Sequence, residues 1–261
     1  MRWRIIFHLI LFLLTMVSCF FIGGVWYALF LITILLTHEL GHFFVSRRYG
    51  VEVTLPFFIP FPLSPFGTLG AVIKMKGIMP NRKALFDIGL AGPFAGLVLT
   101  IPTIIIGLKL SEVAVISEIE GPIIPLGSSI LFSFIEKVIF GYLPEGQDVI
   151  LHPIAYAGWV GLFVTALNLL PVGQLDGGHI IYSLLGKNSK IAYYITLGIL
   201  GLICIFVNPA WTLLLVLLLI FGFNHPPPSD DFTPLDKRRK ILGICTLIFF
   251  VLSFTPVPFQ I

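Results

Sequence analysis

The stretch LLTHELGHFFV, residues 35–45, places two histidines and a glutamate inside a run that is otherwise apolar. A charged side chain at the centre of a bilayer costs roughly 2.5–3.5 kcal/mol even on the scale of translocon insertion. Polar groups in such a helix therefore need a partner that offsets their insertion cost. The stretch predicts a membrane helix and, with it, a binding partner for His38, Glu39 and His42.

Composition places the whole chain among integral membrane proteins. Hydrophobic residues make up 57% of the sequence and charged residues 11%, and the mean hydropathy is +1.02. A soluble domain would carry about 25% charged residues. The three cysteines lie scattered in apolar segments, a spacing that fits neither a metal site nor a disulfide framework.

Several apolar segments reach the ~20 residues that a helix needs to cross the hydrocarbon core. The predicted fold is an all-α polytopic membrane protein with about six to seven transmembrane helices. The first segment has no small-residue cleavage site, so we expect it to be retained rather than removed as a signal peptide. The candidate helices are 5–22, 25–46, 84–108, 153–170, 190–207, 209–223 and 240–256, with a short amphipathic helix near 130–140.

Residues 51–80, which follow the opening motif, are not expected to form a long helix. Prolines interrupt this segment at Pro56, Pro60, Pro62 and Pro65. We expect a short β-hairpin or re-entrant loop near Gly67–Lys76, whose exposed edge could pair with an unwound peptide. The alternative is a cytoplasmic loop that lies on the lipid surface.

The basic residues predict the orientation. If the N-terminus is cytoplasmic and seven helices cross in alternation, all but two of the 16 Lys and Arg fall inside. The exceptions are Lys109 and Lys137. The small net charge of +3 therefore reflects topology rather than a surface for nucleic acid.

The motif HELGH, residues 38–42, has the spacing of a metal site. His38 and His42 are four residues apart, so on a helix they lie on one face and can reach the same ion. Glu39 is one residue on, where it can serve a bound water. The alternative is a pair of histidines hydrogen-bonded inside a helical bundle, with Glu39 paired to one of them.

A catalytic zinc ion usually has three protein ligands and one open position. The candidate for the third ligand is Asp176, in TALNLLPVGQLDGGHIIY at residues 165–182. There an apolar helix ends near Pro171, and irregular backbone of this kind is tolerated where it lines a cavity. The predicted topology puts Asp176 on the same cytoplasmic side as the histidines. The alternative is an ordinary aspartate before a Gly-Gly turn.

HELGH at 38–42 and NLLPVGQLDGG at 168–178 together resemble the site-2 protease family of intramembrane zinc metalloproteases. The resemblance extends to NRKALFDIGLAGP at 81–93 and AGPFAG at 91–96, and it covers roughly residues 25–240. It implies one zinc ion per chain held by His38, His42 and Asp176, with Glu39 as general base. It also implies that Asn168 helps to hold the substrate backbone or the oxyanion. The chain looks like a compact member without a PDZ or CBS domain.

The resemblance implies regulated intramembrane proteolysis of a single-span membrane protein. On this interpretation residues 1–261 form a single transmembrane metalloprotease domain, with a catalytic core at roughly 25–185 and C-terminal helices at roughly 190–256. The protein would be a multi-pass protein, with its N-terminus and active site toward the cytoplasmic side of the cell membrane. Its partners would be the substrate and the lipid bilayer, with no nucleic acid, and a homo-oligomer stays open.

Two other functions remain as alternatives. A membrane protein that binds or transports metal would also place His and Asp in the membrane, but it would need polar residues along several helices. An inactive protease-like scaffold would not need the full set of catalytic residues that the chain contains.

Four polar or small residues near the motifs have simpler expected roles. Asp87 is explained by helix capping at the membrane interface. Gly92 and Gly96 would permit close helix packing. His179 is either a group that supports the metal ligands or a histidine exposed in a turn.

Overall fold

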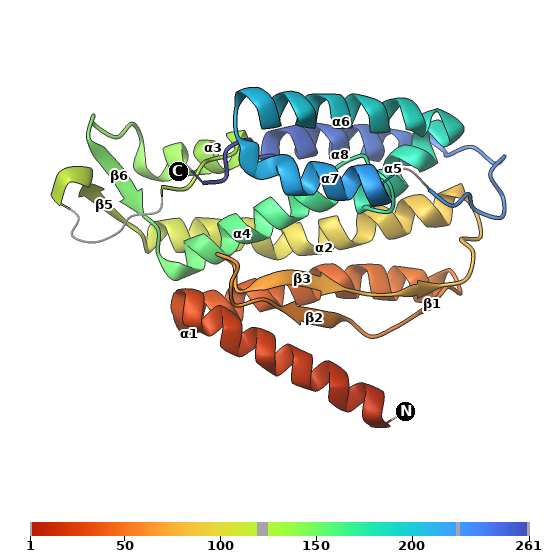
Figure 1. Cartoon of the computed structure of the whole chain (residues 1–261), viewed down its shortest axis with the longest axis horizontal. Coiled ribbons are helices and arrows are strands. Elements are labelled where there is room, and N and C mark those ends of the chain that lie inside the picture. The colour runs from red at the N-terminus through yellow and green to blue at the C-terminus, as the bar shows by residue number, and fades with distance from the viewer. Residues whose placement is uncertain (1, 119–124, 223–224, 260–261) are drawn as a thin grey trace.

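The computed structural model describes residues 2–118, 125–222 and 225–259, and it is mostly helical (Figure 1). In Figure 1, α2 and α4 lie between α1 with its neighbouring strands on one side and α6, α7 and α8 on the other. The helices are α1 (Arg2–Arg48), α2 (Arg82–Lys109), α3 (Ile130–Phe140), α4 (Pro153–Asn168), α5 (Asp176–Leu185), α6 (Ser189–Phe206), α7 (Thr212–Phe221) and α8 (Lys237–Ser253). The strands are β1 (Glu52–Val53), β2 (Phe57–Pro60), β3 (Thr68–Val72), β4 (Met75–Lys76), β5 (Glu112–Val115) and β6 (Gln147–Ile150).

Helix α1 consists of two helical segments separated by a break at two glycines. Gly24 has φ 76°, a left-handed conformation that glycine adopts without steric cost, and Gly23 is also non-helical. The predicted separation between 5–22 and 25–46 is thereby confirmed. The first segment projects away from the bundle (Figure 1), and side chains such as Phe7 and Phe21 are exposed, as lipid contact requires.

Close backbone contacts hold the second half of α1, α2 and α4 together. A Cβ added to Gly41 of α1 would lie 2.4 Å from the Ala91 carbonyl oxygen of α2. A Cβ added to Gly107 of α2 would lie 2.1 Å from the Ala155 backbone nitrogen of α4. Small residues at these positions let the helices approach closely, and such packing dominates helix association in membranes.

The loop after α1 folds into two antiparallel strand pairs, β1 with β4 and β2 with β3. The β-structure predicted near Gly67–Lys76 is present, but β3 and β4 in that range pair with β2 and β1 rather than with each other, and the pairing begins at Glu52 opposite Lys76. The turn between β2 and β3 is bound to the helices: Tyr27 of α1 donates to the Phe66 carbonyl at 2.9 Å and Tyr156 of α4 donates to the Pro65 carbonyl at 2.9 Å. These bonds hold the hairpin against α4 and against α1, the helix that carries the HELGH motif.

The remaining predicted helices are confirmed, with boundaries shifted by a few residues. Helix α3 matches the amphipathic helix expected near 130–140. Two features were not predicted. The strands β5 and β6 pair on either side of α3, and Asp176 begins a separate helix, α5, where a turn was expected.

Three ranges in the described part of the chain are long and apolar enough to cross a membrane, by length and composition: Ile5–Arg48, Arg82–Lys109 and Asp176–Phe206. The apolar helices Pro153–Asn168 and Pro209–Ile220 are shorter. A mostly helical membrane protein with small β-hairpins follows from these observations. The count of six to seven spans stays a prediction.

Candidate metal centre

The two histidines of the motif project from one face of α1, one turn apart. His38 and His42 are 4% and 6% exposed, so both lie in the interior of the bundle. Helix periodicity alone brings their rings together, at a centroid separation of 5.0 Å. The sequence prediction of a shared face is therefore correct.

Asp176 arrives from the break between α4 and α5. Helix α4 ends at Asn168, and α5 begins at Asp176 itself. A Cβ on Gly177 would lie 2.0 Å from the Leu169 carbonyl oxygen, and one on Gly178 would lie 2.3 Å from the Gly173 carbonyl oxygen. Two glycines must follow Asp176 because the start of α5 lies directly against the backbone of the preceding loop.

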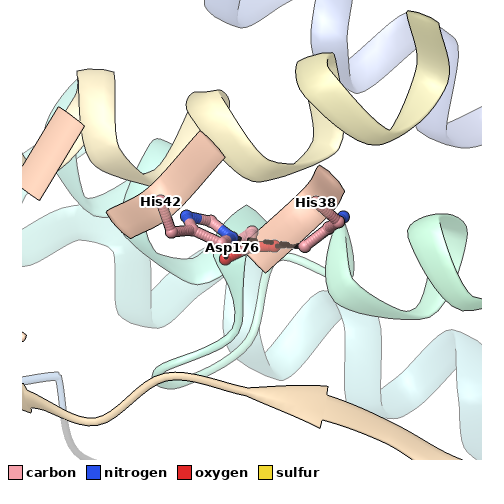
Figure 2. A group of neighbouring side chains, drawn as sticks. All are labelled: His38, His42 and Asp176. Carbon is pink, nitrogen blue, oxygen red and sulfur yellow. Dashed lines mark hydrogen bonds and ion pairs between the residues drawn. The ribbon is translucent and has the colours of Figure 1, made fainter. Parts of the chain in front are cut away.

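The three side chains converge on one point (Figure 2). The Nε2 atoms of His38 and His42 are 3.2 Å apart. Each also lies 3.2 Å from one carboxylate oxygen of Asp176, whose side chain is 14% exposed. One ligand atom from each residue lies within 4.8 Å of the other two, a separation that a single metal ion can bridge.

The backbone of α2 determines which nitrogen of His42 faces Asp176. Nδ1 of His42 lies 2.7 Å from the Ile88 carbonyl oxygen. A carbonyl only accepts, so Nδ1 carries the proton, and Nε2 of the neutral ring presents a lone pair. That lone pair faces a carboxylate oxygen of Asp176, which also only accepts, and Nε2 of His38. A single proton on Nε2 of His38 cannot serve both the carboxylate and the lone pair of His42. The donor set therefore fits a metal cation bound among them.

Two glycines of α2 form the wall behind the histidines. A Cβ on Gly92 would lie 2.0 Å from Nε2 of His42, and one on Gly96 would lie 3.2 Å from Nδ1 of His38. The prediction that Gly92 and Gly96 permit close packing is correct, and the structure adds what they pack against. They leave space for the two imidazole rings.

Glu39 and Asn168 lie beside this group. Glu39 is 6% exposed, and the backbone of Ile73, which follows β3, lies close to its carboxylate. Asn168, the last residue of α4, has its side-chain nitrogen 3.4 Å from Nε2 of His38. All five residues singled out from the sequence are thus brought to one place.

The remaining histidines near the site have structural partners. His179 is buried, and its Nδ1 lies 2.8 Å from Nε2 of His225, whose ring stacks on Tyr182. Burial lowers the pKa of His225, which favours the neutral ring. Of the two roles expected for His179, exposure in a turn is wrong. Sequence reasoning missed His225 as its partner, because nothing local connects residues 46 positions apart.

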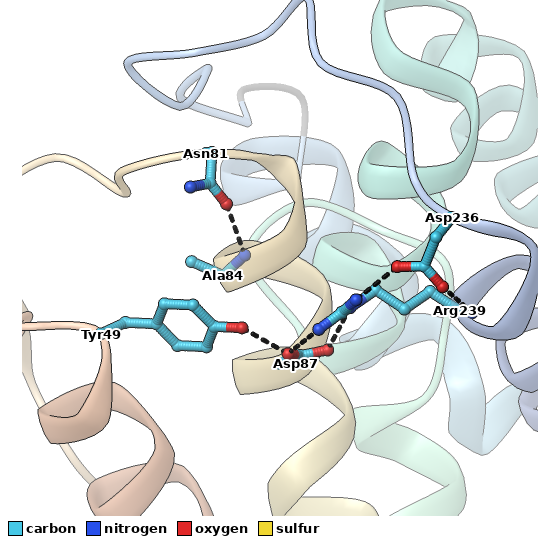
Figure 3. Close-up of polar contacts among 6 residues, drawn as sticks. All are labelled: Tyr49, Asn81, Ala84, Asp87, Asp236 and Arg239. Atoms are coloured by element: carbon cyan, nitrogen blue, oxygen red, sulfur yellow. Dashed lines mark hydrogen bonds and ion pairs between the residues drawn. The ribbon is translucent and has the colours of Figure 1, made fainter.

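The expectation for Asp87 as a capping residue is wrong. Asn81 caps α2 by accepting from the Ala84 backbone nitrogen at 2.9 Å (Figure 3). Asp87 instead binds Arg239 of α8 and Tyr49, which directly follows α1 (Figure 3).

The role of the Ile88 carbonyl in orienting His42 was not predicted either, since every residue has a backbone carbonyl and the sequence does not mark which one accepts a hydrogen bond.

Comparison with known proteins agrees with the geometry. Residues 26–205, more than half of the chain, match peptidase family M50. The chain belongs to this family. The predicted relationship to the site-2 proteases and the expected zinc cofactor are both supported by this match and by the names of the relatives.

Several plant proteins are similar to this M50 chain. The probable zinc metalloprotease EGY1, chloroplastic, of Arabidopsis thaliana is 36% identical over 231 residues, covering 86% of this chain and 41% of that protein. Its namesake in Oryza sativa subsp. japonica is 38% identical over 180 residues, covering 65% of this chain and 31% of that protein. The probable zinc metalloprotease EGY2, chloroplastic, of Arabidopsis thaliana is 31% identical over 229 residues, covering 85% and 40%. The chain spans less than half the length of these relatives.

Proposed function

We propose that this chain is an intramembrane zinc endopeptidase that cleaves transmembrane segments of membrane-protein substrates. The observation that carries the proposal is the convergence of His38, His42 and Asp176 inside a bundle of apolar helices. Membership in peptidase family M50 supports the same activity.

In this proposal His38, His42 and Asp176 hold the zinc ion. The carbonyl of Ile88 keeps Nδ1 of His42 protonated, so its Nε2 is available as a ligand. Zinc, when bound, supplies Lewis acidity, which polarises a carbonyl group and makes water a stronger acid.

Glu39 is the general base. Its carboxylate takes a proton from the attacking water and passes it to the leaving amine, as the reaction requires. The backbone amide of Ile73 lies close enough to this carboxylate to help orient it. Asn168 lies close enough to the ligands to donate from its side-chain nitrogen to the developing oxyanion.

Strand β3 is the proposed binding site for the substrate backbone. A transmembrane helix has all its backbone hydrogen bonds closed, so it must unwind before hydrolysis. One edge of β3 pairs with β2, and no described strand pairs with its other edge. An unwound segment could add there as a further strand. Since Ile73 directly follows β3, the added strand would lie next to Glu39.

The finer points of organisation belong to the same proposal. Residues 1–261 form a single transmembrane metalloprotease domain, with its N-terminus and active site toward the cytoplasmic side of a cell membrane and a single-span protein as its substrate. The positive-inside distribution of Lys and Arg supports this orientation. The relatives named above are described as chloroplastic, so a plastid membrane is the competing location.

Transport of metal is less well supported. A transporter needs successive binding groups along a path through the membrane. In the part of the chain that the structure describes, only one group of three or more His, Cys, Asp or Glu side chains could hold an ion.

The test uses the full chain, purified in detergent and loaded with zinc, on a panel of single-span membrane proteins. Glu39→Gln should keep zinc at the level of the unsubstituted protein and lower the cleavage rate by at least about 100-fold, because it removes the base alone. Gel electrophoresis of the products and metal analysis of the protein measure the two effects. Normal cleavage by Glu39→Gln would exclude the proposed role of this residue.

A further inference from the structure

The polar cluster next to the metal centre joins three helices that are distant in sequence. The Asp87 cluster consists of Tyr49, Asp87, Asp236 and Arg239 (Figure 3). Arg239 donates from Nε and Nη2 to the two carboxylate oxygens of Asp87 at 2.8 and 2.7 Å, the paired geometry that makes such bonds strong. Tyr49 donates to Asp87 at 2.5 Å.

Arg239 is itself held in place by the start of its own helix. Asp236 caps α8 by accepting from the Arg239 backbone nitrogen at 3.1 Å, and it also pairs with the guanidinium group of Arg239. Partial burial and the neighbouring Asp87 carboxylate raise the pKa of Tyr49, so its hydroxyl remains a donor. Asp87 therefore has a fixed position relative to both α1 and α8.

Asp87 precedes the residue that orients a proposed metal ligand. The next carbonyl, that of Ile88, lies 2.7 Å from Nδ1 of His42. Both groups belong to the same rigid turn of α2, so fixing the Asp87 side chain also fixes the Ile88 carbonyl. Tyr49 directly follows the last residue of α1, the helix that carries His42. The backbone contact of Gly41 with Ala91 holds α2 on the other side of His42.

We propose that Asp87 and Arg239 are positioning residues for the metal centre, and that the C-terminal helix α8, through Arg239, is needed for normal metal binding. Arg239 lies beyond the segment that matches the family, residues 26–205. The cluster holds α2 in the register in which the Ile88 carbonyl accepts from His42, and this bond presents Nε2 of His42 to the ion. The inference rests on the proposed function of His38, His42 and Asp176 as metal ligands.

The test measures metal binding rather than activity alone. Cobalt(II) replaces zinc in the full-length chain in detergent, and its visible absorption reports the ligand set while a titration gives the dissociation constant. Asp87→Asn and Arg239→Gln should weaken cobalt binding by about 10- to 100-fold, the range for groups that support metal ligands, and should alter the absorption bands. Arg239→Lys, which keeps the charge but loses the paired geometry, should lie between Arg239→Gln and the unsubstituted chain.

The matched control is Arg238→Gln, because Arg238 is the neighbouring arginine on the same helix and its side chain is exposed. This variant should bind cobalt as the unsubstituted chain does. Thermal unfolding of the metal-free variants separates a loss of stability from a change in the site. If Asp87→Asn or Arg239→Gln does not fold, Tyr49→Phe removes a single bond to Asp87 and should shift cobalt affinity in the same direction by a smaller factor.

Unchanged cobalt affinity and spectrum in Arg239→Gln would overturn the inference, even if that variant unfolds at a lower temperature. The proposed function fails separately: if His42→Ala binds cobalt as well as the unsubstituted chain, the ion is not held at this centre, and the inference falls with it. If the unsubstituted chain binds cobalt and cleaves substrate while Arg239→Gln matches it in both, only the inference is wrong.

Discussion

The metal centre lies on the last turns of α1, the Asp87 cluster includes Tyr49 just beyond the end of that helix, and the two groups differ in how their charges are balanced. In the Asp87 cluster the guanidinium group of Arg239 forms ion pairs with the carboxylates of both Asp87 and Asp236, and every bond joins a donor to an acceptor. In the metal centre Asp176 and Glu39 lie beside two histidines, and no described Lys or Arg forms an ion pair with either carboxylate. The Asp87 cluster therefore needs no bound ion to pair its charged groups. The metal centre has carboxylates without a Lys or Arg partner in the described part of the chain, and its ligand atoms are spaced so that a single cation can bind among them.

The largest effect is expected from removing the carboxylate of Asp176, the proposed anionic ligand of the metal centre. Asp176→Ala should lower zinc affinity by more than about 100-fold, beyond the range for losing a supporting group, and should abolish cleavage. Metal analysis after dialysis measures the loss. Asp148→Ala is the control, because Asp148 is an exposed aspartate on β6. If Asp176→Ala retained zinc, the Asp176 carboxylate would not be needed to bind a cation, and the contrast with the Asp87 cluster would be wrong.

A second test alters the space around the ligands without removing one. Gly92→Ala places a methyl group 2.0 Å from Nε2 of His42, so the ring must move. We expect at least about 10-fold weaker zinc binding and a matching loss of cleavage. Gly198→Ala on α6 is the matched control, since an added Cβ there meets nothing within 4 Å. Equal zinc affinity in the two variants would contradict the close packing of Gly92 on His42.

A substitution of Asn168 tests whether catalysis can be impaired without loss of metal binding. Asn168→Ala should reduce the cleavage rate by about 100- to 1,000-fold, the range for losing one oxyanion donor, and leave zinc content unchanged. Rate measurements at saturating substrate, together with metal analysis, test both statements. A loss of zinc in this variant would instead make Asn168 a support for His38, which lies 3.4 Å from its side-chain nitrogen.

The smallest effect concerns the stability of the Asp87 cluster. Tyr49→Phe removes one hydrogen bond to a carboxylate that keeps its pairing with Arg239, at a cost of about 1 kcal/mol. That corresponds to a fall in unfolding temperature of about 2–4 °C, measured on the metal-free protein. Tyr142→Phe, at a residue 84% exposed, should show no such fall. An equal effect of the two variants would argue that the cluster does not stabilise the bundle.

Features that depend on residues close in sequence were predicted, and features that depend on residues far apart in sequence were not. The helices and the break at Gly23 and Gly24 were predictable, because apolar runs and glycines act locally. The start of α5 at Asp176 was not, because two glycines after it favour a turn by propensity. The close packing of Gly177 against the Leu169 carbonyl overrides that preference. The β5–β6 pair joins strands more than 30 residues apart, so no short hairpin turn in the sequence connects them.

The sequence by itself determined the membrane class, the shared helical face of His38 and His42, and Asp176 as the third candidate ligand. The first two depend on composition and on spacing within one helix, and the third on the predicted order in which the helices cross the membrane. The tertiary structure decided that the Ile88 carbonyl orients His42, that glycines of α2 make room for the histidines, and that Arg239 binds Asp87 across 152 residues. These contacts form only when separate helices pack, and a backbone carbonyl is present at every residue, so no local pattern marks the one that is used.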